Sequence, residues 1–192
     1  MSQALIYEKM SFDGQNLAGR DLSHSQFLHC TFRGTNLTGV DFEAADLRWS
    51  DFTAANLTGT NFYAAMLEGT ILDDVITDDT TRWLKLYCPE TGPFIGYKKG
   101  FNHCLIQLLI PADAKRSSAT RNSCRCSKAK VLAIYDPLTL ERYREAQSYA
   151  DPDFIYRVGQ WIEPDKYTED RFIDSTHGIH FWMSREEALG YL

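Results

Sequence analysis

The sequence predicts a mainly β protein, in which a short four-sided β-helix of about three coils is followed by a small α+β domain. Three observations lead to this prediction. Leu or Phe recurs at every fifth position from residue 12 to residue 72, the two halves differ in charge, and short apolar runs bounded by Pro and Gly begin after residue 88. We therefore place the repeat region with its N-terminal cap at 1–76, a capping helix or linker at 77–87, and the α+β domain at 88–192.

A period of five fits neither a helix, whose buried face repeats every 3.6 residues, nor a strand, whose faces alternate. If the chain turns a corner every five residues, four pentads close one coil and equivalent side chains stack in successive coils. A small residue, two positions before each Leu or Phe from Ser25 to Thr70, also points inward. The expected columns are Phe12, Phe32, Phe52 and Leu72; Leu17, Leu37 and Leu57; Leu22, Phe42 and Phe62; and Phe27, Leu47 and Leu67.

Particular residue types in the sequence indicate the corners of this coil and the segments that cover its two ends. Asn or Asp precedes most of the central Leu and Phe residues, as at Asn36 and Asp41, and Gly often follows two places after them, as at Gly39. The open ends of a β-helix must be covered. We expect MSQALIYEKM to cover the first end and a helix over 77–87 to cover the second, with capping oxygens and apolar cover from Thr77, Asp78, Asp79, Trp83, Leu84 and Leu86.

The stretch from about Asn16 to Asp74 resembles the pentapeptide-repeat family, whose signature reads A-(D/N)-L-x-x. AADLR (44–48) and AANLT (54–58) match it closely, whereas Met66 and Ile71 replace the Asn or Asp as the array ends. The resemblance implies a right-handed quadrilateral β-helix. The signature specifies the fold and says little about function.

The whole acidic excess of the chain lies in the repeat region. Residues 1–76 carry ten acidic and four basic side chains, and residues 77–192 carry sixteen of each. Such a surface repels phosphates, so we expect no direct nucleic-acid binding by this half. Some members of the family mimic duplex DNA and inhibit topoisomerase, but three coils rise only about 15 Å, the length of about five base pairs. DNA mimicry is therefore kept as an alternative function.

Composition predicts a soluble cytoplasmic protein. The sequence has no apolar run of membrane-spanning length, and its first ten residues lack the features of an export signal. Its five cysteines are odd in number and scattered, which favours reduced thiols over a disulfide framework. We expect no membrane partner, and the oligomeric state stays open.

The second half reads as an antiparallel α+β domain. The expected strands are 94–99, 104–110, 128–135, 154–162 and 177–183; Ser184 caps a closing helix over 185–192, and 141–150 is a helix or an insertion. This half resembles a C-terminal module of unknown function found in bacteriophage and prophage pentapeptide-repeat proteins. The matching segments are 88–99, 110–132, 154–159 and 175–188. In the last of them, His177 interrupts the pattern of the module. The resemblance implies a phage-encoded protein in the bacterial host cytoplasm.

A basic stretch, KRSSATRNSCRCSKAK (115–130), is the first candidate site, because it carries no acidic residue and combines cations with hydroxyl groups. It is interpreted either as an anion-binding segment or as a solvated loop. There is no glycine-rich phosphate cradle. The candidate ligand-binding residues are Lys115, Arg116, Arg121, Arg125, Lys128 and Lys130.

Two further candidates lie in the same domain. Cys88, Cys104, Cys124 and Cys126, with His103, contain thiolate and imidazole ligands for zinc, although a lone C-x-C is poor zinc spacing and buried free thiols are the alternative. His180 is a candidate general base or a half-buried structural histidine. No Ser/His/Asp order and no paired-carboxylate motif is present.

These observations favour a non-catalytic binding protein without a cofactor. The β-helix serves as a scaffold, and the C-terminal domain binds a host protein or a small phosphorylated ligand, in a host-takeover or anti-defence role if the phage resemblance holds. The alternatives are a nucleotide- or ADP-ribose-processing enzyme in the C-terminal domain and a DNA-mimicking topoisomerase inhibitor.

Overall fold

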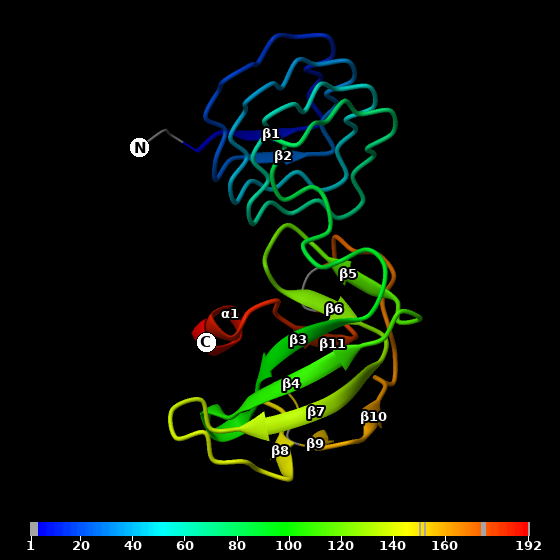
Figure 1. Ribbon diagram of the computed structural model, residues 1–192. Helices are drawn as coiled ribbons and strands as arrows, with labels where there is room; N and C mark the ends of the chain where they lie inside the picture. The colour runs from blue at the N-terminus through cyan, green and yellow to red at the C-terminus, as the bar shows by residue number, and fades with distance from the viewer. Residues whose placement is uncertain (1–3, 150, 152, 174–175, 192) are drawn as a thin grey trace. The chain divides into compact units, whose positions relative to one another are not determined.

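The computed structural model describes residues 4–149, 151, 153–173 and 176–191, which form two compact units (Figure 1). The first unit comprises the chain up to Lys85 together with Ala119–Arg121, Phe172 and Ile173. The second comprises Leu86–Ser118, Asn122–Arg171 and the described residues after 175. None of the helices in the described ranges is both long and apolar enough to cross a membrane.

The first unit is a stack of coils in which each coil takes four pentads. Strand β1 (Ile6–Glu8) pairs in parallel with β2 (Gln26–Leu28), with Tyr7 opposite Phe27. Parallel bridges continue up the stack between residues 20 positions apart, from Ser11 with Thr31 to Asn56 with Ile76. The pentad period therefore sets the coil, as the sequence predicted.

The predicted side-chain columns form the core of this unit. Eleven of the thirteen central residues are buried, and Phe12 and Leu72 at the two ends are partly buried. Ring centroids of Phe12 and Phe32 lie 5.0 Å apart, and those of Phe32 and Phe52 lie 4.8 Å apart in stacked geometry. The predicted stacking of Phe12, Phe32 and Phe52 in successive coils is therefore confirmed.

Inward-pointing small residues also connect the coils through hydrogen bonds. The Ser50 hydroxyl donates to the Phe27 carbonyl at 2.6 Å and accepts the Cys30 amide at 3.0 Å. Thr60 donates to the Leu37 carbonyl at 2.9 Å. Because a buried hydroxyl without a partner is costly, these bonds allow polar residues in the core positions.

The corners follow the Asn/Asp pattern. The Asn36 side-chain oxygen accepts the Thr38 amide at 3.1 Å, and Asp41 accepts the Glu43 amide at 2.9 Å. The residue two places after the central one adopts positive φ, which is 66° at Gly39. Glycine tolerates this conformation without strain.

The far end of the coil differs from the prediction, because residues 77–87 form turns and bends in place of a helix. Asp78 accepts the Thr80 and Thr81 amides at 2.9 and 3.2 Å, which closes a turn, and Arg82 then bridges Asn61 as a further length of coil. The turn-forming Asp competes with helix initiation, and pairing with the last coil satisfies its open edge. Trp83 and Leu84 do pack on the core as expected, as do Leu5 and Tyr7 of the N-terminal cap, whose residues 1–3 lie outside the described chain.

A segment from the second half of the sequence completes this end. The Ala64 amide donates to the Thr120 carbonyl at 2.9 Å, and the Thr120 hydroxyl donates to the Ala65 carbonyl at 2.6 Å. Phe172 packs against the same core. The cover of the coil is therefore partly non-local in sequence.

The second unit is an antiparallel α+β structure, as predicted. Figure 1 shows a four-stranded sheet ordered β10-β7-β4-β3, beside a three-stranded sheet ordered β11-β6-β5 and a hairpin of β8 and β9. The strands are β3 (Phe94–Lys99), β4 (Leu105–Ile110), β5 (Arg116–Ser118), β6 (Cys124–Cys126), β7 (Ala129–Tyr135), β8 (Glu145–Gln147), β9 (Ile155–Arg157), β10 (Trp161–Ile162) and β11 (Ile179–Phe181), and a 3-10 turn, η1, spans Phe101–His103.

Two predicted segments of this unit differ in detail. The run 154–162 is divided into β9 and β10 by a turn at Gly159, whose φ is 86°. The segment 141–150, left open as a helix or an insertion, contributes strand β8, and its residue 150 is outside the described part. Helix α1 (Arg185–Gly190) begins as predicted, with a capping box between Ser184 and Glu187. It packs through Ala188 in a cluster with Leu105 and Trp182.

Candidate functional site

Arg116 of the basic stretch is an internal structural residue. Its guanidinium donates to the carbonyl oxygens of Gly92 at 2.7 Å, Pro111 at 2.8 Å and Ala112 at 3.0 Å, with longer bonds to those of Pro89 and Ala114. Its carbon Cζ lies 5.1 Å from the Phe94 ring centroid. The planar fork of donors therefore fixes two loops onto β5.

We expect Arg116→Met to destabilise the second unit by about 2 kcal/mol, because hydrogen bonds to a charged group contribute roughly 1.5–3 kcal/mol and several carbonyls lose their donor together. Urea unfolding measures this. Arg142→Met is the matched control, since Arg142 is exposed. Equal stability of the two variants would contradict the structural role.

The other five cations of the stretch do not meet at one place. Arg125 is buried on β6 and donates to the Asp170 carbonyl at 3.1 Å, whereas Arg121 is exposed. Lys115 forms an ion pair with Glu169. Lys128 and Lys130 lie over the Trp161 ring, with Nζ 5.1 and 5.7 Å from its centroid, and Lys128 is also 3.4 Å from an Asp113 oxygen. The basic stretch therefore forms the hairpin of β5 and β6. Its cations contact different partners, some inside the unit and some on its surface.

The four candidate zinc cysteines are buried free thiols that do not assemble into a metal site. Within the described ranges, no group of three or more His, Cys, Asp or Glu residues is placed to hold a metal ion. A hydrogen bond with Cys88, together with burial, raises the pKa of Cys124. Burial raises the pKa of Cys126 to about 12. Cys124 and Cys126 therefore stay protonated at neutral pH and are poor nucleophiles, whereas the hydrogen bond with Cys124 lowers the pKa of Cys88.

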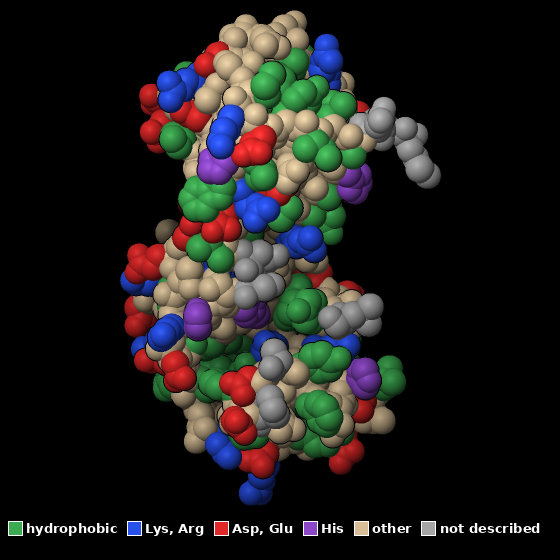
Figure 2. Space-filling view, turned by 180° about the vertical axis from the view of Figure 1, so that it is seen from behind, with side chains coloured by type: hydrophobic (Ala, Val, Ile, Leu, Met, Phe, Trp, Pro, Cys, Tyr) green, Lys and Arg blue, Asp and Glu red, His purple; other side chains and the backbone are tan. Residues whose placement is uncertain are grey.

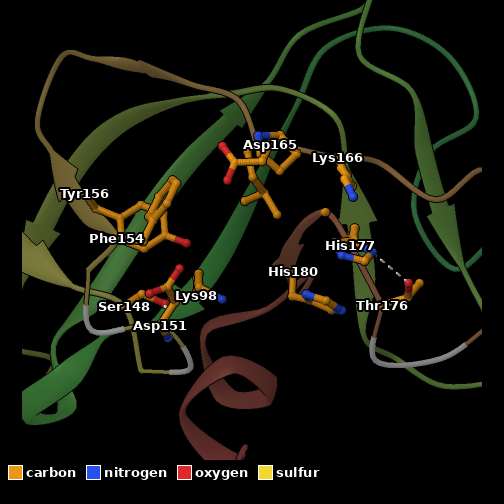
Figure 3. Close-up of a pocket in the computed structure, with 13 residues that line it drawn as sticks. Lys98, Ser148, Asp151, Phe154, Tyr156, Asp165, Lys166, Thr176, His177 and His180 are labelled. Atoms are coloured by element: carbon orange, nitrogen blue, oxygen red, sulfur yellow. Dashed lines mark hydrogen bonds between the residues drawn. The ribbon is translucent and has the colours of Figure 1, made fainter.

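His180 lies in a pocket of about 520 Å³ that is open to solvent on one side and lies wholly within the second unit. In Figure 3, Phe154 and Tyr156 lie on one side of this pocket and His177 and His180 on the other. Asp165 and Lys166, from the segment after β10, lie above them in the same view. We call this the Lys98 pocket; it is lined by Lys98, Ser148, Asp151, Phe154, Tyr156, Pro164, Asp165, Lys166, Thr176, His177, Gly178, Ile179 and His180.

Lys98 is the residue that sequence reasoning missed. It lies on β3, is only 8% exposed, and turns its amine into the pocket toward the side that carries His180 (Figure 3). Burial lowers the pKa of Lys98 to about 8, opposed by the nearby Cys126. Its neighbour Lys99 donates to the carbonyl of Leu189 in α1 at 3.4 Å and to the carbonyl of Tyr191, directly after α1, at 2.9 Å. The sequence does contain an indication of this. Lys98 and Lys99 are successive residues of one strand, and because side chains alternate along a strand, the two lysines must point to opposite faces of the sheet.

Other groups of the pocket add proton donors and acceptors. Tyr156 is buried, and burial, opposed by a hydrogen bond with Ser148, raises its pKa. The His177 Nδ1 lies 3.4 Å from the Thr176 hydroxyl (Figure 3). The pocket therefore gathers two lysines, two imidazoles, two carboxylates and three hydroxyl groups around one volume.

Two family models match the chain. The model described as "Family of unknown function (DUF5758)" matches residues 84–188, more than half of the chain, and the model described as "Pentapeptide repeat region" matches residues 6–81. The chain belongs to the DUF5758 family. It carries a pentapeptide repeat region before its DUF5758 domain, and every residue of the Lys98 pocket lies within that domain.

Three solved structures that are similar to this DUF5758 protein are pentapeptide repeat proteins. Rfr23 from the cyanobacterium Cyanothece 51142 is 23% identical, with 42% of this chain and 65% of that chain covered and a TM-score of 0.25. HetL from Nostoc sp. strain PCC 7120, involved in heterocyst differentiation regulation, is 20% identical, with 37% and 44% covered and a TM-score of 0.24. AT2G44920 from the Arabidopsis thaliana thylakoid lumen is 24% identical, with 38% and 54% covered and a TM-score of 0.21.

The chain spans less than two thirds of the length of each of these three proteins. No curated protein matches it. The description of the family that matches residues 84–188 assigns no function.

Proposed function

We propose that this protein is a non-catalytic binding protein in which the DUF5758 domain holds a small phosphorylated, hydroxyl-bearing ligand in the Lys98 pocket. The observation that supports this most directly is the convergence of Lys98, Lys166, His177 and His180 on one pocket of about 520 Å³. Phosphate oxygens accept hydrogen bonds, and lysine and imidazole groups are suitable donors. Asp151 and Asp165 are suited to accept hydrogen bonds from hydroxyl groups of the same ligand.

The repeat region is proposed as the scaffold of this protein, with a right-handed quadrilateral coil of about three turns. Several of its carboxylates already serve the coil. Arg48 donates to Asp46 at 2.7 and 2.8 Å, and this bonding lowers the pKa of Asp46. Arg33 pairs with Asp51 at 2.6 Å. On the face seen in Figure 2, acidic and basic side chains of the repeat unit are interspersed, which favours a scaffold over DNA mimicry.

The concave shape of the site favours a small ligand over a host protein, since small molecules bind in clefts of this volume. We place the protein in the cytoplasm of a bacterial host, as a phage-encoded factor whose ligand belongs to host metabolism or defence. This setting rests on the resemblance of residues 88–188 to modules of phage proteins.

Calorimetric titration with inorganic phosphate, glycerol 3-phosphate, adenosine 5′-monophosphate and ADP-ribose tests the proposal. We expect at least one organic phosphate to bind, and Lys166→Ala combined with His177→Ala to weaken it about tenfold or more, a loss of about 1.4 kcal/mol. Lys128→Ala is the matched control, because Lys128 lies over Trp161 and outside the Lys98 pocket.

Equal affinity of wild type and the double variant would contradict the proposed site. Consumption of ADP-ribose or the nucleotide during the titration would identify an enzyme instead. In that case, His180 would be the candidate for the general base, as the sequence analysis suggested.

A further inference from the structure

We propose that Lys98 holds an aldehyde or ketone phosphate as a reversible imine on its side-chain amine. This inference rests on the proposed function, because it uses the same pocket and names the class of ligand more narrowly. It predicts that the pocket distinguishes a sugar phosphate with a free carbonyl group from its reduced alcohol.

The surroundings of the amine are unusual for a lysine. Lys98 is buried, yet its Nζ makes no hydrogen bond or ion pair with any residue in the described ranges, although Asp151 and Asp165 line the same pocket. Lys99, one residue further along β3, is equally buried but donates to two carbonyls at the C-terminal end of the chain. Two adjacent buried lysines therefore differ in whether the amine is engaged or directed into an accessible cavity.

An amine in this position is available as a nucleophile. Burial lowers the pKa of Lys98 to about 8, so at pH 7 roughly one molecule in ten carries the free base. An ordinary lysine of pKa 10.5 is a free base in fewer than about one molecule in a thousand. Desolvated lysines of this kind form Schiff bases with carbonyl compounds.

The proposed reaction balances without an oxidant or a reductant. The Lys98 nitrogen lone pair attacks the carbonyl carbon, an N–C bond forms, and the proton lost from nitrogen is taken up by the oxygen to give a carbinolamine. The C–O bond then breaks, the oxygen leaves as water with one further proton, and a C=N bond forms. Addition of water reverses both steps and restores the free ligand.

The pocket supplies groups for these proton transfers and for holding the rest of the ligand. His180 lies across from the Lys98 amine and is placed to give the proton that converts the departing hydroxyl into water (Figure 3). Lys166 and His177 are placed to bind a phosphate. Asp151 and Asp165 accept hydrogen bonds from sugar hydroxyls, so the lining matches the open-chain form of a sugar phosphate.

The test uses three matched compounds: glyceraldehyde 3-phosphate, glyceraldehyde without the phosphate, and glycerol 3-phosphate without the carbonyl. Each is incubated with the full chain at pH 8 and then reduced with sodium borohydride, and modified lysines are mapped by peptide mass spectrometry. We expect glyceraldehyde 3-phosphate to label Lys98 at least about tenfold faster than any other lysine, and glycerol 3-phosphate to slow this labelling. Lys98→Met should abolish the major adduct, and Lys99→Met should retain it.

The outcomes separate this inference from the proposed function. If glycerol 3-phosphate binds but Lys98 is never labelled, the imine is wrong and the phosphate site stands. If glyceraldehyde labels Lys98 as fast as its phosphate does, and glycerol 3-phosphate does not compete, the imine stands and the phosphorylated ligand is wrong. If Lys98 is not labelled and no phosphate compound binds, both proposals fail.

Discussion

Replacing Phe52 with alanine is expected to lower the free energy of unfolding of the repeat unit by about 3–5 kcal/mol. Phe52 is fully buried, with its ring centroid 4.8 Å from that of Phe32 and 6.3 Å from that of Phe42. Truncation removes the apolar burial of a whole ring and leaves a cavity between two coils. The coils cannot collapse into it, because parallel bridges hold their spacing on every side. Urea unfolding followed by circular dichroism measures the change.

Two further variants show whether the column itself is responsible. Phe52→Leu should cost less than half as much, because leucine already fills the equivalent position of this column at Leu72. Met66→Ala should change stability by less than about 0.5 kcal/mol, because its side chain is exposed. A Phe52→Ala loss as small as that of Met66→Ala would show that the stacked rings do not stabilise the coil.

The interior of the repeat unit was predictable from the sequence, because the pentad period fixes both the direction of each side chain and its neighbour in the next coil. The end of the unit was not. The segment 77–87 had the composition of a helix, but Asp78 forms a turn and Arg82 pairs with the last coil. Thr120, which completes the cover, is distant in sequence, and no periodic pattern links it to Ala64.

In the second unit, strands β3, β4, β7, β9, β10 and β11 and the cap of α1 were predictable, whereas β5, β6 and β8 were not. The candidate site was only partly predictable. The sequence of the basic stretch 115–130 shows where its cations lie along the chain but not where each side chain points. Arg116 and Arg125 of this stretch donate to backbone carbonyls. His180 was identified and lies in the pocket, but its neighbours come from β3, β9 and the segment after β10. Lys98 was overlooked because a lysine in a strand is normally taken as solvent-exposed.

Lys98→Met is expected to stabilise the protein by about 3 kcal/mol at pH 7, and this gain should shrink as the pH rises. The pKa of Lys98 falls from an ordinary 10.5 to about 8 in the folded state, so the unfolded chain binds more protons between these values. Stability of the wild type therefore rises with pH from about 8 to about 10.5, and below pH 8 the cost of burying the charge is fully present. Methionine removes that cost at every pH, so denaturant unfolding of both proteins from pH 6 to pH 10.5 measures the difference.

The comparison isolates Lys98, because the other titratable groups around it are unchanged in the variant; these are Cys126, Asp151, Tyr156, Asp165, Lys166, His177 and His180. Lys99→Met is the matched control and should behave oppositely. It removes the donor to the Leu189 and Tyr191 carbonyls and should destabilise the protein. If Lys98→Met and Lys99→Met lower stability alike, the amine of Lys98 is held by partners in solution and is not available in the pocket. A stabilised Lys98→Met protein that no longer forms the adduct would show that the wild type retains a costly buried amine for binding.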